Sequence, residues 1–574
     1  MDNQTTRPTT KETTVFRNKT ATQHNFAIVP RAEIPRSKFT MRQTRKQAFD
    51  ASDLIPIMCE EVLPGDVWQH NENILARLAT PIAPAVDDLY METFYFFVPN
   101  SITWPSWEPF ITGTDDELTI PTVEPYDTGG STYTVLPHSV FAHFGILPQL
   151  YNPRLYINIL PIWAYFTIWN EWFRDQNLQE EWEWSDTWTT NASSDITQAT
   201  GPVLWNQMPL RINKRHDYFT SSLPFAQKGD AVTIGLTGTF PVTTASSDGV
   251  TSRANPISFR DVATDAYPTP ASLIGVQNAN GILATGSATG EAVNADSLFP
   301  SNLEVDLATA TLTTINQIRL AFQTQRLLER DARGGSRYVE QLLAHFGVRA
   351  PDYRLQRPEY LGGSKIPVTV NPVAQTAAYD AEPDPTEPSA LGNLGASMHV
   401  SGSKRTFTYS ATEHGYIIGL ACARATPTYQ QGTRRHWRRQ TRLDFYFPVF
   451  SHLGEQAVAT QEIYQPANNN PSNDTWGYQE RHAEYRYTPN EITSVLRSTA
   501  AQPLDWWHYS EEFGSEPALN AAFITDKTKE TLARSLATAP NDQWSAQIIM
   551  DILHDSNVAR LMPAYSVPGL IDHF

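Results

Sequence analysis

The sequence predicts a mainly β protein, built as a two-sheet antiparallel jelly roll with long loop insertions and a few helices. Three observations support this fold class. Aromatic residues make up 11% of the 574 residues and prolines (41) outnumber glycines (29), a composition typical of sheets joined by loops. Candidate strands lie far apart in the sequence, with helical and loop-rich segments between them. Leu89–Val98 is mostly apolar at both alternate sets of positions, as expected for a strand buried on both faces.

The first 49 residues differ from the rest of the chain. They are polar and carry ten Lys/Arg against three Asp/Glu. We expect residues 1–49 to form a basic, extended arm, because they hold too few apolar side chains to build a core. Residues 50–229 then supply the first part of the jelly roll. This part opens with LIPIMCEEVLPGD (54–66), which ends in the turn signal Pro-Gly-Asp.

An apolar segment within this first part predicts a helical insertion. Ile162, Tyr165 and Trp169 recur at helical spacing, so we expect an amphipathic helix that packs against the sheets or a neighbouring chain. The wider segment 155–173 is almost long enough to cross a membrane. It contains polar residues such as Glu171, which are costly in lipid, so a buried or interface helix is the favoured interpretation.

Residues 230–310 have a composition of their own. They are rich in Ala, Thr, Ser and Gly, contain almost no Lys or Arg, and include short alternating runs such as AVTIGLTGTF. Small polar residues without a continuous apolar pattern are typical of surface loops that tolerate variation. We therefore expect a variable surface insertion with some strand content, forming a protrusion.

Residues 311–574 are expected to complete the jelly roll. Ile315–Phe346 is the clearest helical stretch and breaks at Gly334-Gly335. Thr406–Ala425 predicts a hairpin. Phe407 and Tyr409 alternate with polar residues, and a turn signal at His414-Gly415 then leads into a second apolar run within the same segment. The segment LDFYFPVF (443–450) predicts a further strand.

The formal net charge of −18 argues against a protein that lines nucleic acid over its whole surface, because such a protein should be basic. One segment between 434 and 442 is an exception, with five arginines, one tryptophan and no acidic residue. Such a patch could contact phosphates and stack a base, or it could form ion pairs between subunits. The candidate DNA or inter-subunit contacts are Arg434, Arg435, Trp437, Arg438, Arg439 and Arg442.

The chain lacks the sequence motifs of catalytic and cofactor sites. It has no phosphate-binding loop, dinucleotide fingerprint, nucleophile elbow, HExxH or CxxC motif. Cys59 and Cys422 are too few for a disulfide framework. His508 and Glu511 have a spacing compatible with metal ligation on a helix, but two residues fall short of a site and surface polar residues are the commoner case. We therefore predict no enzyme activity, cofactor or metal site.

One segment favours an alternative class of function. Acidic residues between 171 and 186 lie among five tryptophans, and carboxylates beside aromatic rings also describe a glycosidase cleft. A β-sandwich carbohydrate-active enzyme or carbohydrate-binding protein is therefore the alternative hypothesis. Acidic segments rich in tryptophan are more often packed interfaces with solvated rims, so the structural interpretation is preferred.

Several long sequence blocks occur in order over nearly the whole chain. They are IPRSKF (34–39), FDASDLIPIMCEEVLPGD (49–66), ARLATPIAPAVDDLYMETFYFFVPN (76–100), NEWFRDQNLQ (170–179), LLERDARGGSRYVEQLLAHFGVRAPDYRLQRPEYLGG (327–363), TYQQG (428–432), HLGEQAV (452–458), GYQERHAEYRY (477–487) and YSVPGLIDHF (565–574). In these blocks the chain resembles the major capsid proteins of the Microviridae, in the gokushovirus-like branch. The first thirty or so residues and the insertion at 230–310 lie outside the blocks.

The resemblance implies an eight-stranded jelly roll of the viral capsid type. It also implies self-assembly into a T=1 icosahedral shell that encloses a circular single-stranded DNA genome, with the protein ending in the virion. Assembly would take place in the cytoplasm of the bacterial host. The implied partners are an internal scaffolding protein, a DNA pilot protein and a small basic DNA-binding protein, the last of which fits the acidic net charge of this chain.

The resemblance also gives the insertion a role. Shells of this branch lack a separate spike protein and carry a long insertion in the capsid protein near the three-fold axes. We therefore expect residues 230–310 to form such a protrusion and to meet a host surface receptor. A structural cap that only stabilises the contact between three subunits is the alternative.

The C-terminal block 565–574 places apolar residues between turn formers and ends in an aromatic residue. A subunit of a closed icosahedral shell has to bury several different patches. We therefore expect this tail to dock on a neighbouring subunit. The candidate interface residues are Tyr565, Val567, Pro568, Leu570, Ile571 and Phe574.

Overall fold

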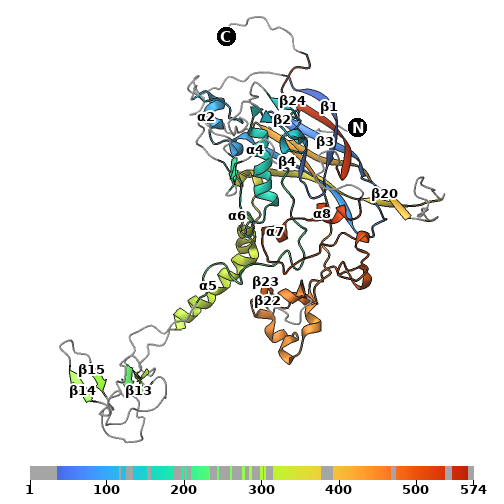
Figure 1. Cartoon of the computed structure of the whole chain (residues 1–574). Helices are drawn as coiled ribbons and strands as arrows, with labels where there is room; N and C mark the ends of the chain where they lie inside the picture. The colour runs from blue at the N-terminus through green and yellow to red at the C-terminus, as the bar shows by residue number, and fades with distance from the viewer. Residues whose placement is uncertain are drawn as a thin grey trace, which may run out of the picture. The chain divides into compact units, whose positions relative to one another are not determined.

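The computed structural model describes most of the chain outside the two ends and the insertion. The described residues are 35–114, 118–123, 133–151, 157–184, 196–198, 201–202, 208–232, 315–376, 392, 394–466, 474–536 and 546–565, with six short strands between 242 and 305. The chain divides into two compact units (Figure 1). The first consists of Met1–Pro224 and Ser336–Phe574, and the second of Phe225–Gly335.

Two antiparallel sheets form the body of the first unit (Figure 1). The five-stranded sheet has the order β1 (Ser37–Phe49), β24 (Ile548–Arg560), β3 (Val67–Leu78), β20 (Leu394–Ser410) and β19 (Thr369–Ala374). The four-stranded sheet has the order β18 (Glu359–Pro367), β4 (Leu89–Pro99), β21 (Gly415–Ala425) and β2 (Ile55–Val62). Buried side chains of both sheets form one apolar cluster between them. This architecture confirms the predicted mainly β jelly roll.

The strand β4 shows why the core lies where it does. Its odd-numbered residues Met91, Tyr95 and Phe97 belong to the apolar cluster between the sheets. The even-numbered Phe96 and Val98 belong to a second cluster on the outer face of the same sheet. The strand is therefore buried on both faces, as its sequence predicts.

The second cluster is built around the predicted helix, which is α4 (Leu160–Ile168), followed by one π-helical turn at Trp169–Phe173. The expectation of an amphipathic helix was wrong, because apolar side chains on all sides of α4 are buried. The helix packs on β4 and β21 at the outer face of the four-stranded sheet and on α1 (Asn100–Thr103), and seven of its nine side chains are buried. Among the described residues, no helix is long and apolar enough to span a membrane.

The thirteen residues from Ser37 to Phe49, which the sequence placed in the extended arm, form the edge strand β1. They pair with β24 along their whole length. Most side chains of β1 are exposed or half-buried, and Phe49 alone in this strand is a buried apolar residue. Backbone pairing needs no apolar side chains, so a polar composition did not prevent this segment from joining the sheet.

Two further predictions in the second half of the chain were wrong. Thr406–Ala425 does not form a hairpin, because β20 pairs with β3 and β19 in one sheet while β21 pairs with β4 and β2 in the other. The strand β21 is buried on both faces and lies inside the four-stranded sheet, with β4 along one edge and β2 along the other. Residues 443–450 form no strand either. They lie in 3₁₀ turns, because Asp444 closes one turn and Pro448, which has no N–H for a sheet, begins the next.

The described residues of the second unit form one long helix and three short strand pairs. The helix α5 (Ile315–Gly334) ends at the predicted Gly334-Gly335 break. The strand pairs are nested, with β12 (Val242–Thr244) on β17 (Leu303–Val305), β13 (Phe259–Asp261) on β16 (Leu298–Pro300), and β14 (Ile274–Gln277) on β15 (Leu283–Gly286). These pairs give the strand content that the alternating runs predicted.

A chain of buried polar side chains crosses the core from one sheet to the other. The hydroxyl of Ser556 lies 2.7 Å from Nδ1 of His70, and Nε2 of His70 lies 3.4 Å from Nδ1 of His554. Nε2 of His554 then donates to the carbonyl of Ile57 at 3.0 Å. With both imidazoles neutral, the hydroxyl of Ser556 donates to Nδ1 of His70, and Nε2 of His70 donates to Nδ1 of His554. Burial lowers the pKa of His70 to about 3 and that of His554 to about 4.

We expect the unassembled subunit to lose stability as the pH falls from about 6.5 to 4. Unfolded histidine titrates near 6.5, whereas the folded pKa values of His70 and His554 are about 3 and 4, so the unfolded chain binds more protons in this range. Each histidine should then lower the free energy of unfolding by about 1.4 kcal/mol per pH unit. Urea unfolding between pH 4 and 7 measures this slope. His554→Gln should reduce the slope, and an unchanged slope would contradict the assignment.

Candidate assembly and nucleic-acid surfaces

The predicted arginine cluster lies on a third apolar cluster, which is separate from the two that flank the sheets. This third cluster is built around β22 (Glu455–Ala459), β23 (Thr475–Glu480) and the aromatic residues before and after them. The chain enters it through Gly432, where a Cβ atom would lie 2.0 Å from the carbonyl oxygen of Glu462. Only glycine permits this approach, and it brings the arginines that follow close to Glu462.

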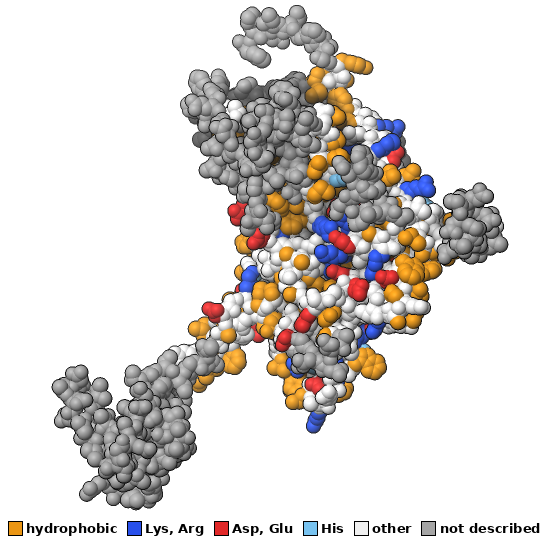
Figure 2. Space-filling model, in the orientation of Figure 1, with side chains coloured by type: hydrophobic (Ala, Val, Ile, Leu, Met, Phe, Trp, Pro, Cys, Tyr) orange, Lys and Arg blue, Asp and Glu red, His pale blue; other side chains and the backbone are white. Residues whose placement is uncertain are grey.

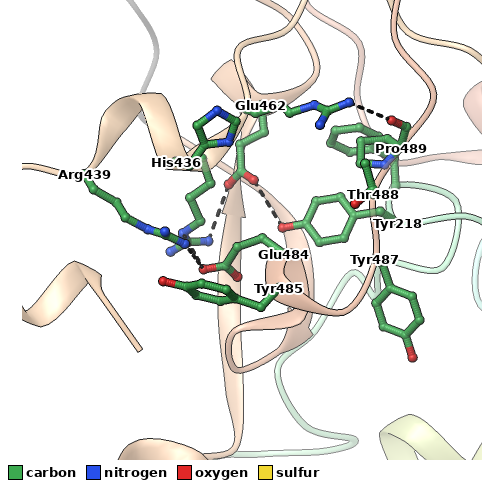
Figure 3. A pocket seen from close by; sticks show the side chains of 12 residues that line it. Tyr218, His436, Arg439, Glu462, Glu484, Tyr485, Tyr487, Thr488 and Pro489 are labelled. Carbon is green, nitrogen blue, oxygen red and sulfur yellow. Dashed lines mark hydrogen bonds and ion pairs between the residues drawn. The ribbon is translucent and has the colours of Figure 1, made fainter. Parts of the chain in front are cut away.

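Three of the five arginines form ion pairs with carboxylates of the same subunit, and the pairs with Glu462 and Glu484 are drawn in Figure 3. The carboxylates come from segments that follow the arginines in the sequence and fold back over them. The pairs are Arg434 with Glu491 at 2.9 Å, Arg435 with Glu462 at 3.4 Å and Arg439 with Glu484 at 3.1 Å. The positive charge that the sequence shows is therefore largely compensated within the subunit.

The two central carboxylates differ in their surroundings. Burial raises the pKa of Glu462, against the charge of Arg435 and a hydrogen bond from the hydroxyl of Tyr218 at 3.1 Å. Burial also opposes ionisation of Glu484, but hydrogen bonds, including one from Gln456, hold the pKa of Glu484 below its usual value. Glu484 therefore stays ionised to lower pH than Glu462 does.

Two pockets lie on either side of these pairs and share Arg435, Arg439, Glu462 and Glu484 as a common wall. The first has a volume of about 250 Å³ and is also lined by tyrosines, among them the half-exposed Tyr485 (Figure 3). The second has a volume of about 370 Å³. Guanidinium groups beside aromatic rings can hold a phosphate and stack a base, although the carboxylates in the wall weaken the attraction for an anion.

The remaining members of the predicted set have other surroundings. The guanidinium of Arg442 lies 5.4 Å from the centre of the Phe447 ring. Trp437 is 76% exposed, and its ring centre is 4.9 Å from that of His436. Burial lowers the pKa of the Arg438 guanidinium. Arg442 and Trp437 are therefore the members of the set that are most available to a partner.

Sequence reasoning found the arginines and missed the carboxylates that pair with them. Glu484 follows Arg439 by 45 residues. It lies in the block 477–487, where acidic and basic residues alternate. Opposite charges at such separations give no signal of contact, because the pairing depends on how the segments fold back over β22 and β23.

The structure describes only one residue of the predicted C-terminal interface. Tyr565 is 82% exposed. The other predicted members of this tail, Val567, Pro568, Leu570, Ile571 and Phe574, lie outside the described residues.

The alternative sites do not assemble. Asp175 accepts backbone N–H groups of its own turn, and Glu181 pairs with Arg174 at 2.9 Å, so these carboxylates serve local structure and do not converge on a cleft. His508 is buried and not a surface residue, and its ring bonds the Leu496 carbonyl. Within the described ranges, no group of three His, Cys, Asp or Glu side chains could hold a metal ion.

Comparisons with known proteins agree with this structural picture. The chain matches a family described as "Capsid protein (F protein)" over residues 27–570. It is 37% identical to capsid protein VP1 of Chlamydia phage 1 and 39% identical to that of Bdellovibrio phage phiMH2K, in each case over 96% of this chain and 98% of the relative. Identity to capsid protein VP1 of Spiroplasma virus 4 is 36%, over 95% of this chain and 97% of the relative.

These matches confirm the resemblance to the gokushovirus-like capsid proteins and a structural, non-enzymatic role. They run through both parts of the jelly roll and across the segment that separates them. The chain belongs to the phage capsid protein (F protein) family.

Proposed function

We propose that this chain is the subunit of a T=1 icosahedral shell that encloses a circular single-stranded DNA genome. The observation that carries the proposal is the similarity to capsid proteins over 96% of the chain, together with the two-sheet jelly roll. A closed shell requires several contact patches on each subunit. Large apolar side chains are exposed in separate places on the face shown in Figure 2, as a subunit with several docking surfaces requires.

The charge distribution supports a virion in which a protein other than this chain neutralises most of the DNA charge. The chain carries a formal net charge of −18, and three arginines of its most basic segment are paired with its own carboxylates. Most of the DNA charge then has to be neutralised by other molecules, in our proposal by a small basic DNA-binding protein. A DNA pilot protein and an internal scaffolding protein complete the proposed set of partners, with assembly in the cytoplasm of the bacterial host.

We further propose that the segment 230–310 contacts a receptor on the host surface. Its near-absence of Lys and Arg suits recognition by shape and hydrogen bonding more than by electrostatic steering. The pair β12–β17 joins the two ends of this segment, so the residues between can vary without disturbing the sheets.

The shell itself is tested by electron microscopy of cells that carry the remaining phage genes. The full-length chain should give closed particles with T=1 symmetry. Deleting residues 565–574 should abolish particles and leave soluble subunits, because the tail is proposed to dock on a neighbour and the deletion leaves β24, which ends at Arg560, intact. Particles of normal yield from the shortened chain would remove the role of the tail.

The arginine segment is tested by comparing an available residue with a paired one. Arg442→Gln combined with Trp437→Ala separates the two interpretations. If these residues contact DNA, complete shells should lose packaged DNA during salt washes, with the salt slope reduced by about 0.7 for each phosphate that the subunit no longer binds. Arg439→Gln is the matched control, since Arg439 is paired with Glu484 and its replacement should reduce subunit stability instead. If the double variant fails to form even empty shells, ion pairing between subunits is the better interpretation.

The insertion is tested by replacing residues 245–295 with a short Gly/Ser linker, which keeps the β12–β17 pair. Particle yield and adsorption to host cells are then measured on the same preparation. We expect normal particle yield and loss of adsorption. Normal adsorption would exclude a receptor role, whereas loss of particles would favour a structural cap.

A further inference from the structure

The segment from Trp437 to Leu453 carries exposed apolar side chains, and it includes residues 443–450, where the sequence predicted a strand. Its two 3₁₀ turns, Arg442–Asp444 and Pro448–His452, leave large apolar side chains on the outside. Val449 is 84% exposed and Trp437 is 76% exposed. We call this surface the apolar ridge, and its members are Trp437, Leu443, Phe445, Val449 and Leu453.

The ridge is held in place by contacts within the subunit. The carboxylate of Asp444 accepts the backbone N–H groups of Gln440 and Thr441 at 2.9 and 2.7 Å. The guanidinium of Arg439 lies 5.5 Å from the centre of the Phe445 ring, while its Nη2 bonds Glu484. The outward position of the apolar side chains is therefore fixed before any partner binds. Five large exposed apolar side chains within seventeen residues of chain, bordered by arginines, indicate a surface for binding.

We propose that the apolar ridge packs against a second copy of this chain in the shell. The inference rests on the proposed shell function and adds the surface through which neighbouring subunits meet. Its composition is that of a protein–protein contact, with Trp, Phe and Arg beside aliphatic side chains. Val449, Leu443 and Leu453 have no flat ring on which a base could stack, so nucleic acid suits most of the ridge poorly.

Charge complementarity favours a second copy as the occupant. Residues 434–453 contain five arginines and one aspartate, so the rest of the chain is four charges more negative than the −18 of the whole. Three of these arginines are paired with carboxylates of their own subunit, so the attraction toward another, net acidic copy rests on Arg442 at the border of the ridge. Arg442, whose contact within the described residues is the Phe447 ring, remains available for such a contact.

The contact is tested by placing a photo-crosslinking amino acid at position 449 in full-length chains. Light and heavy isotope-labelled chains are assembled together, and mass spectrometry then distinguishes links between copies from links within one copy. We expect crosslinks between light and heavy chains. Val449→Glu should lower particle yield by about tenfold or more, while the unassembled subunit keeps the circular dichroism and urea midpoint of the unchanged chain. The matched control Val449→Ile should assemble normally.

The outcomes separate this contact from the shell proposal. Intact particles in which position 449 links to DNA, to another virion protein or to nothing would overturn the ridge contact and leave the shell standing. Normal yield from Val449→Glu would overturn the ridge contact as well. Links between copies in small oligomers, from a chain that never forms closed particles, would support the ridge contact and overturn the shell.

Discussion

The two sheets of the subunit are locked to one another by buried polar side chains, and the rest of the structure depends on that layer. Glu72 of β3 is 1% exposed, and its carboxyl group accepts hydroxyl groups of Thr93 and Tyr95 on β4 at 3.1 and 2.8 Å. Beside it, His554 bonds the backbone of β2. Apolar packing tolerates small shifts, but a buried polar group without its partner is costly. The layer therefore selects one placement of the sheets, and with it the outer face on which α4 packs.

The third apolar cluster shows a different use of charge. Its arginines meet carboxylates of the same chain, and Glu484 serves Arg439 and, at 4.0 Å, Arg435. Pairs formed within a subunit are already in place when subunits meet, so they add little to the attraction between copies. They do hold the turns between 434 and 453 in one conformation. Ordering a surface in advance lowers the entropic penalty of association, which matters when one subunit makes many contacts at once.

The fold was more predictable than the site, for physical reasons that particular residues show. Leu89–Val98 is mostly apolar in both alternate sets of positions, and burial on both faces follows directly. In β3 the inward positions Trp68, His70, Glu72 and Ile74 mix apolar and polar residues, and no local signal identifies partners on other strands. The error at 443–450 has the same origin, since an apolar run has the same composition whether it is buried in its own subunit or faces another molecule.

The pairing of β1 with β24 sets the order of events during synthesis. Thr40 and Asn557 bond one another across 517 residues of chain. A ribosome that adds about 5–20 residues per second needs roughly half a minute to nearly two minutes to cover that distance. Throughout this time one edge of β3 lacks the strand that will cover it. Open sheet edges promote aggregation, so the five-stranded sheet stays incomplete and exposed to wrong pairing until the residues of β24 have been synthesised.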